Sequence, residues 1–258
     1  MNESGFRNFA IRKITPNSAR RDPDPMPDNY RDFIEIGNAA AATPFVGITT
    51  DGTPRTELYD VAAERGDGAA LAALGRAVFE SFDENQRQRA CHDIDGPQWR
   101  LWSNTPRFAL RHGVMLEDIT QAQREMVLAL MRASMSKDGF EACRNAMKLN
   151  EFLLEYTGDR ENLGEWVYFF SMYGMPSARE PWGWQMDGHH VNVNCFILGA
   201  EIVLTPLFLG AEPLVADAGK YAGTRMFDRE QNSALRLVRS LTPEQRKTAI
   251  LFPSMRSA

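Results

Sequence analysis

Two adjacent histidines, His189 and His190, are the residues of this sequence whose type and position could most readily support chemistry. They follow Asp187 and Gly188 in the segment 180–208, which holds half of the chain's four histidines. An imidazole titrates near neutral pH and can serve as a general acid, a general base or a metal ligand. A carboxylate beside an imidazole orients it and raises its basicity, so Asp187 is the expected companion.

The residues that follow the pair alternate between apolar and polar side chains, which is typical of a half-buried strand. One face would carry His189, Val191, Val193, Cys195 and Ile197, and the other would carry His190, Asn192 and Asn194. On this pattern the two imidazoles diverge, and His190 heads a row of amides. A bulge at Gly188 would place Gln185 and Asp187 on the face of His190, whereas an unbroken strand would leave Asp187 beside His189.

Three interpretations of the histidine pair stay open. His189 can be a hydrogen-bonded core histidine, with the asparagine row facing water. One histidine and Asp187 can instead form an acid–base pair beside a pocket. In the third interpretation His189 and His190 hold a divalent transition metal, zinc or iron, although such a site usually takes three or four protein ligands. The two other histidines, His92 and His112, lie in segments without ligand spacing.

Three tryptophans are candidates for the walls of a ligand pocket. Trp182 and Trp184 flank Gly183 just before the histidines, and Trp102 lies in 95–114, an aromatic segment rich in turn residues. Large aromatic side chains either hold a loop on the core or line a pocket for a small molecule. The substrate-binding candidates are therefore Trp182, Trp184, Trp102, Asn192 and Asn194.

Composition restricts the class of protein. The 258 residues are 43% hydrophobic and 24% charged, as in an ordinary globular protein. A net charge of −5 argues against nucleic-acid binding, which needs a basic face. No apolar run reaches the roughly 18 residues of a membrane span, and the N-terminus shows no secretory signal. Three widely spaced cysteines predict reduced thiols in a cytoplasmic protein. The expected partner is a small-molecule ligand, and self-association as a homo-oligomer stays open.

The first part of the chain predicts an arm followed by one α+β domain. Residues 1–43 are expected to be poorly ordered, because 17–30 combines three prolines with alternating charges. The domain would cover 44–258. Within it, the turn dipeptide Asp51-Gly52, between the apolar stretches 45–48 and 58–59 (which include Phe45, Leu58 and Tyr59), predicts a short hairpin.

Helices are predicted next, and strands after them. Apolar residues at three- and four-residue spacing predict helices over 68–82 and 137–156, the second ending near Gly158. Alternation over 191–197 and 202–205, with a turn around Gly199, predicts an antiparallel hairpin. The helical part would thus pack on an antiparallel sheet, which is an α+β arrangement.

Three helix starts share one pattern of residues. Asp83, Thr120 and Thr242 each follow an apolar residue and precede, by three positions, a glutamine with an arginine after it. The cap residue and the glutamine can satisfy each other's backbone amides as a capping box, and the alternative is an anion site of arginine and glutamine.

Several motifs resemble the bacterial domain-of-unknown-function 3500 family. They are YGMPSAREPWGWQMDGHHVNVN at 173–194 and TPLFLGAEP at 205–213, with FVGITTDG, LWSNTP, RHGVML and SLTPEQRKTAI elsewhere. The likeness covers about 44–258, and it favours a functional role for the Gly-His-His element. It also implies a further strand region with a second histidine motif after the point where this chain stops, so that the chain would be C-terminally short.

The leading hypothesis is a small-molecule enzyme, a metal-assisted hydrolase that uses the Gly-His-His element. His190 and His189 would be ligand or base, and Asp187 would orient them. One alternative is a non-catalytic binding or scaffold protein, or a fragment, whose sheet is completed by a partner chain. Another is a metal-dependent oxidoreductase.

Overall fold

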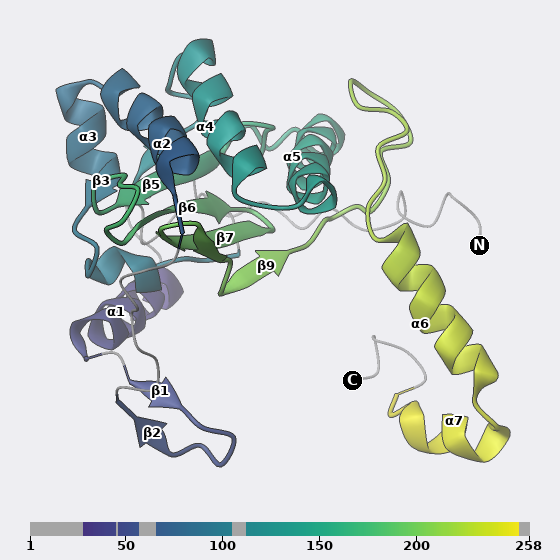
Figure 1. Cartoon of the computed structure of the whole chain (residues 1–258). Coiled ribbons are helices and arrows are strands. Elements are labelled where there is room, and N and C mark those ends of the chain that lie inside the picture. Colours follow the sequence, from purple (N-terminus) through teal and green to yellow (C-terminus); the bar gives the residue numbers. More distant parts are fainter. Residues whose placement is uncertain (1–27, 45, 57–65, 105–111, 253–258) are drawn as a thin grey trace.

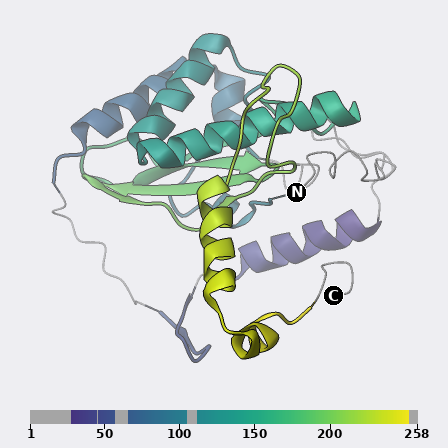
Figure 2. The ribbon, with the colours of Figure 1, turned by 90° about the vertical axis from the view of Figure 1, so that its right-hand side faces the viewer.

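The computed structural model describes residues 28–44, 46–56, 66–104 and 112–252, and it has the predicted α+β architecture. Four helices, α2 (Ala69–Ser81), α3 (Glu84–Ala90), α4 (Gln121–Ala133) and α5 (Lys137–Thr157), cover one face of a seven-stranded sheet (Figures 1 and 2). Helix α1 (Asp28–Ala42) lies on the opposite side. Within the described residues, no helix has the length and apolar character required to cross a membrane.

Helix α1 departs from the expected arm, of which residues 1–27 lie outside the described part of the chain. The run of four alanines at 39–42 favours a helix. Arg100, in the short 3-10 helix η2 (Pro97–Arg100), donates to the carbonyls of Ala40 (3.0 Å), Ala41 and Thr43 (2.6 Å). A cation at the last turn satisfies carbonyls that have no helical partner, so a contact 57 or more positions away holds this helix end.

The predicted first hairpin is present. Strands β1 (Gly47–Ile48) and β2 (Pro54–Arg55) pair antiparallel around a turn in which Gly52 has a φ of +80°. Phe45, Leu58 and Tyr59, which were expected to flank it, lie outside the described residues.

All three predicted capping boxes form. Asp83, Thr120 and Thr242 cap α3, α4 and α7 (Pro243–Ala249), each in exchange with the glutamine three residues on. The arginine after each glutamine donates to the carbonyl of the apolar residue before the cap. These pairs are Arg87 with Phe82 (2.7 Å), Arg124 with Ile119 (2.8 Å) and Arg246 with Leu241 (3.0 Å). Helix capping therefore accounts for the glutamine and the arginine of each motif, without an anion.

The sheet contains β3 (Cys91–His92), β4 (Val114–Met115), β5 (Tyr168–Tyr173), β6 (Trp182–Gly188), β7 (Val191–Leu198), β8 (Glu201–Val203) and β9 (Leu207–Leu209). Its order is β3-β5-β6-β7-β8, with β4 beside β5 and β9 beside β7, and β3 alone pairs parallel. The predicted turn around Gly199 joins β7 to β8. The prediction that the histidines lie within a strand is wrong, because they form the turn between β6 and β7.

The sheet buries its apolar face against the helices. Val191, Val193, Cys195 and Ile197 are fully buried on β7, as the alternation predicted, and Trp182, Trp184 and Met186 join them from β6. A Cβ at Gly75 of α2 would lie 2.6 Å from the ring of Trp182, so this helix approaches the sheet as closely as only glycine permits.

The C-terminal helices extend away from the sheet. Between β9 and α6 (Asp228–Ser240), a loop places Ala216 and Met226 in the core. Helices α6 and α7 bury no residue, and they project from the body of the protein (Figure 1).

We expect the buried capping glutamine to stabilise the fold more than the exposed one. Gln123 also donates to the carbonyl of Ser81 (2.7 Å) and to Gln86 Oε1 (2.8 Å), and so joins the ends of α2, α3 and α4. Gln123→Ala would leave a poorly hydrated carbonyl without its donor and lower the free energy of unfolding by about 1–3 kcal/mol. Urea denaturation would measure it. Gln245→Ala, the same change at the exposed third box, should cost about 0.5 kcal/mol or less, and equal losses would contradict the explanation.

Candidate functional site

Two of the three predicted pocket walls belong to the core. Trp182 and Trp184 are fully buried under the helices. The Trp184 indole donates to Ser134 Oγ (3.1 Å) and stacks on Phe170 with ring centroids 6.2 Å apart. Trp182 and Trp184 therefore pack in the core, where a substrate cannot reach them. Trp102 is half-buried in the loop after η2.

The predicted row of polar residues on β6 and β7 lies on the face of the sheet opposite the helices. These residues are buried, and they do not face water. Asp187 pairs with Asn192 across β6 and β7, and Gln185 pairs with Asn194. The Asn192 amide donates to Asp187 Oδ1 (2.5 Å) and to the carbonyl of Ser103 (2.7 Å), in the loop that covers this face. The Gln185 amide donates to Asn194 Oδ1 (2.6 Å). Asp187 and Asn192, and likewise Gln185 and Asn194, are thus hydrogen-bonded pairs in one layer beneath the loop. The strand register is regular through Gly188, so the bulge considered there does not form.

His92 and His112, which showed no ligand spacing in the sequence, meet at the end of this layer. Their ring centroids are 5.7 Å apart, and Tyr173 lies beside both. His112 Nε2 lies 2.6 Å from Gln185 Oε1, which can only accept, so this nitrogen carries a proton. Burial lowers the pKa of His92, with Asp93 opposing the shift.

A buried carboxylate organises the region between α5 and the start of β5. Glu165 accepts from Arg144 (2.6 Å), from Lys220 (3.0 Å) and from the Tyr221 hydroxyl. Burial alone would raise the pKa of Glu165, but hydrogen bonds from Tyr221, Lys220 and Arg144 outweigh burial and hold that pKa below its usual value. The carboxylate therefore stays charged and fastens the loop after β9 to the body of the domain.

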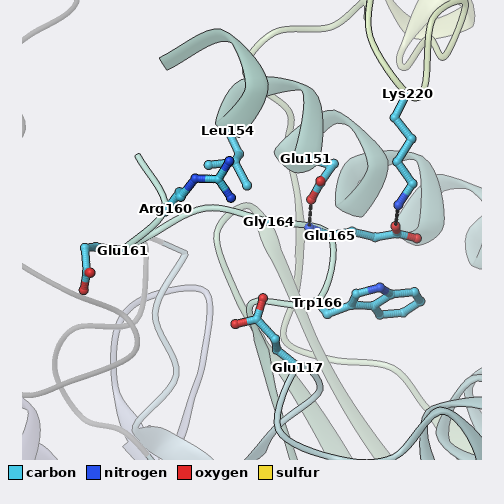
Figure 3. A pocket seen from close by; sticks show the side chains of 9 residues that line it. All are labelled: Glu117, Glu151, Leu154, Arg160, Glu161, Gly164, Glu165, Trp166 and Lys220. Carbon is cyan, nitrogen blue, oxygen red and sulfur yellow. Dashed lines mark hydrogen bonds and ion pairs between the residues drawn. The ribbon is translucent and has the colours of Figure 1, made fainter. Parts of the chain in front are cut away.

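A pocket of about 470 Å³ opens beside Glu165 (Figure 3). Charged side chains dominate its lining, which includes Trp166 as an aromatic wall. They are Glu117, Glu151, Glu161, Glu165, Arg160 and Lys220. The pocket is thus strongly polar, and neither Trp182 nor Trp184 lines it.

His189 and His190 are the two residues of the tight turn that joins β6 to β7. Gly188 pairs with Val191, which leaves only the histidines between the strands. His190 has a φ of +61°, a conformation that residues other than glycine seldom adopt. The imidazoles consequently do not diverge; the rings stack with centroids 4.0 Å apart and planes 30° apart.

His189 is held by α5. Its Nδ1 lies 2.8 Å from Asn150 Oδ1, and Asn150 Nδ2 donates to the carbonyl of Gly164 (2.9 Å), a residue of the pocket wall. Asn150 is itself 4% exposed. Burial, with a smaller contribution from the neighbouring His190, lowers the pKa of His189 to about 3. The ring is therefore neutral at physiological pH.

His190 faces a carboxylate other than the expected one. Its Nε2 lies 3.9 Å from Glu212 Oε2, while Asp187 lies in the buried polar layer between the sheet and the loop that contains Ser103. Burial lowers the pKa of His190, and Glu212 opposes that shift. The ring also lies near Phe208, with centroids 6.2 Å apart, and near Gly210, where a Cβ would come within 3.4 Å of it. Glu212 thus replaces Asp187 as the acidic companion.

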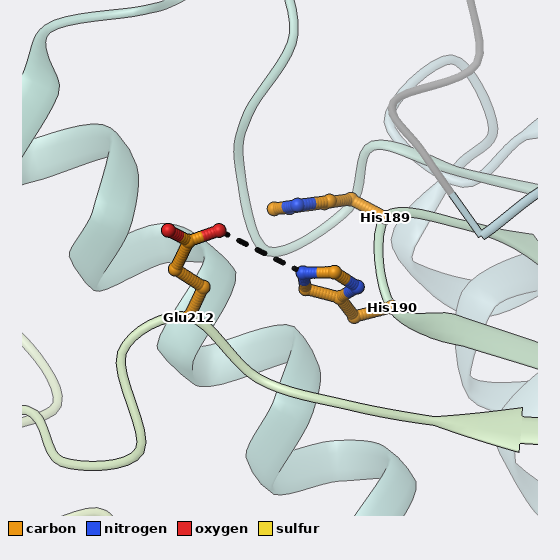
Figure 4. A group of neighbouring side chains, drawn as sticks. All are labelled: His189, His190 and Glu212. Atoms are coloured by element: carbon orange, nitrogen blue, oxygen red, sulfur yellow. Dashed lines mark ion pairs between the residues drawn. The ribbon is translucent and has the colours of Figure 1, made fainter. Parts of the chain in front are cut away.

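His189, His190 and Glu212 converge on one point (Figure 4). One ligand atom from each lies within 4.8 Å of the others. Around a tetrahedral ion such atoms stand about 3.4 Å apart, as bonds of 2.0–2.2 Å require. Glu212 is 64% exposed and can move inward. One stacked ring must also turn, because the lone pairs of both imidazoles lie in their ring planes.

The two residues that complete this cluster could not be found from sequence spacing. Asn150 lies 39 positions before His189 and is a polar residue inside a helical apolar stripe. Glu212 belongs to the TPLFLGAEP segment, which marked it only as part of a motif.

The buried imidazole makes the stability of the protein depend on pH. A histidine in the unfolded chain has a pKa near 6.5, so below that pH the unfolded chain binds a proton that folded His189 does not. Stability present above about pH 6.5 is therefore lost as the pH falls towards 3. We expect His189 to remove about 2 kcal/mol from the free energy of unfolding between pH 7.5 and pH 5. Urea denaturation across this range should give a flatter profile for His189→Gln, and parallel profiles would contradict the assignment.

Comparison with known proteins relates this chain to one family. Searches of curated proteins and of solved structures found no match. The family described as "Protein of unknown function (DUF3500)" matches residues 64–258, which is more than half of the chain and includes the histidine turn, Asn150 and Glu212. The first hairpin lies outside the matched region. The chain belongs to the DUF3500 family.

Proposed function

We propose that this protein is a metal-dependent enzyme that acts on a small molecule, with hydrolysis as its reaction. The observation that carries the proposal is the convergence of His189, His190 and Glu212 within 4.8 Å. Two histidines and one glutamate are a ligand set of catalytic zinc sites, in which a further position stays open for water or substrate. The lowered pKa of each histidine supports the proposal, because a neutral imidazole has the lone pair that a metal requires.

The chemistry of the donor set defines what a bound metal would supply. A divalent zinc ion polarises a carbonyl or lowers the pKa of a bound water, which suits hydrolysis. Two histidines and one carboxylate also hold iron in oxygenases, so the same residues would serve an oxidoreductase. Nitrogen and carboxylate donors favour zinc or iron over calcium or magnesium, which prefer all-oxygen sites.

The substrate is proposed to be a polar small molecule in the pocket beside Glu165. Gly164 lines this pocket, and its carbonyl accepts from Asn150, which in turn contacts His189. A single side chain thus connects the pocket wall to the candidate centre. The unpaired thiols Cys91, Cys143 and Cys195 support a reducing compartment such as the cytoplasm.

We expect the purified protein to bind one zinc or iron(II) ion at His189, His190 and Glu212. A ligand that binds only the folded state raises the melting temperature, so adding metal to chelator-treated protein should stabilise it. Elemental analysis would give the stoichiometry, and thermal unfolding with and without metal would give the shift.

Two variants and one control make this test specific. His190→Ala and Glu212→Gln should each lose the metal-dependent shift, whereas Glu180→Gln, a change at an exposed glutamate outside the cluster, should keep it. A wild-type protein that binds no transition metal, or a shift that survives both variants, would refute the metal site.

A second candidate function, self-association as a binding or scaffold protein, is favoured by the C-terminal helices. Helices α6 and α7 bury no residue, and isolated helices of this length are marginal in water. Leu237 (64% exposed) on α6 and Leu251 (80%) and Phe252 (56%) after α7 are large apolar side chains open to solvent. We propose that they form an apolar contact surface for a second copy of this chain.

We expect this apolar surface to hold a dimer. Light scattering on the eluting protein should give twice the 29.1 kDa of the chain, and Leu237→Asp with Leu251→Asp should return it to one copy. Ile48→Asp, at an equally exposed apolar residue of the first hairpin (73%), is the matched control and should remain dimeric. A monomeric wild-type protein at micromolar concentration would rule out this candidate function.

A further inference from the structure

The polar environment of His189 determines which of its two nitrogens can take part in chemistry. Asn150 is almost fully buried on α5, and its amide can be oriented in only one way. Its Nδ2 donates to the carbonyl of Gly164 (2.9 Å), which can only accept. The amide oxygen therefore faces His189 Nδ1 at 2.8 Å.

An amide oxygen is an acceptor and has no proton to give. The 2.8 Å contact consequently requires the proton of the neutral His189 ring to be on Nδ1. The lone pair is then left on Nε2, at the other side of the ring. Free histidine populates both tautomers, so this contact selects one of them.

We propose that Asn150 is a positioning residue that keeps His189 in the Nδ1–H tautomer and presents Nε2 to the ligand of the histidine–glutamate cluster. That Nε2 receives a metal rests on the proposed function, whereas the tautomer itself does not. In metal sites, the partner of the second imidazole nitrogen commonly fixes the ring in this way.

The hydrogen bond from Asn150 to Gly164 also connects His189 to the pocket. Its Nδ2 is bonded to the segment that forms one wall of the 470 Å³ pocket. A ligand that displaces this wall would disturb the amide that holds His189. The positioning contact is thereby a direct physical link between the pocket and the imidazole.

Nitrogen-15 NMR of the full-length, metal-free protein at pH 8 tests the proposal directly. Long-range proton–nitrogen correlations distinguish a protonated from an unprotonated imidazole nitrogen, and His189→Gln identifies the His189 signals. We expect protonated Nδ1 and unprotonated Nε2 at His189. A proton on Nε2 in the wild-type protein would overturn the proposal, whether or not the protein binds metal.

Three variants extend the test to ligand binding, with zinc competed against a chromophoric chelator. Asn150→Leu removes the acceptor, and it should populate both tautomers and weaken zinc binding by about 10–100-fold. Asn150→Asp keeps an acceptor and should keep the Nδ1–H tautomer. Ser134→Ala deletes an equally buried hydrogen bond, that of Trp184, and should change neither readout.

The outcomes separate this inference from the proposed function. An Asn150→Leu protein with an unchanged tautomer and unchanged zinc affinity would overturn the role of Asn150. Wild-type protein with the Nδ1–H tautomer but no zinc binding would contradict the metal proposal and support Asn150 as the residue that presents a general base. If Asn150→Leu does not fold, the wild-type and Asn150→Asp spectra still decide.

Discussion

The tight turn between β6 and β7 is the constraint from which the geometry of the candidate site follows. Pairing of Gly188 with Val191 leaves two residues to reverse the chain, and both are histidines. The positive φ of His190 turns its ring alongside that of His189, so the imidazoles stack instead of separating. Everything else at the site acts on this pair: Asn150 binds one ring from α5, and Glu212 faces the other from the segment after β9.

The family motif around the histidines is a single structural unit. The carbonyl of Pro206 accepts from the backbone and the side chain of Asn194 (3.3 and 2.8 Å), which fixes β7 beside the TPLFLGAEP segment. Gly210 donates its amide to the carbonyl of His190 (2.8 Å) and leaves room for the imidazole. The loop after β9 contains Lys220, which binds the buried carboxylate of Glu165. A charge from a distant part of the sequence therefore supports the segment that carries Glu212.

Local patterns predicted the elements well, because capping, helical spacing and turn dipeptides are decided by neighbouring residues. The capping boxes at Asp83 and Thr120 are examples. The histidine site was harder to predict. The polar residues switch from odd positions (185 and 187) to even ones (192 and 194), and this switch fits a bulge at Gly188 as well as it fits the observed two-residue turn. His-His also lacks the Asn-Gly character of common two-residue turns. The partners Asn150 and Glu212 come from distant segments, and no local spacing encodes such contacts.

We propose that one imidazole of the stacked pair turns and that Glu212 moves inward, so that the three side chains bind one metal ion. Crystallography with anomalous scattering tests this proposal most directly. Crystals grown with zinc should show a single strong anomalous peak bonded to His189 Nε2, His190 Nε2 and Glu212 at about 2.0–2.2 Å. The two rings should have turned out of their parallel arrangement. A peak elsewhere on the protein, or rings that stay stacked with no metal between them and Glu212, would contradict the account.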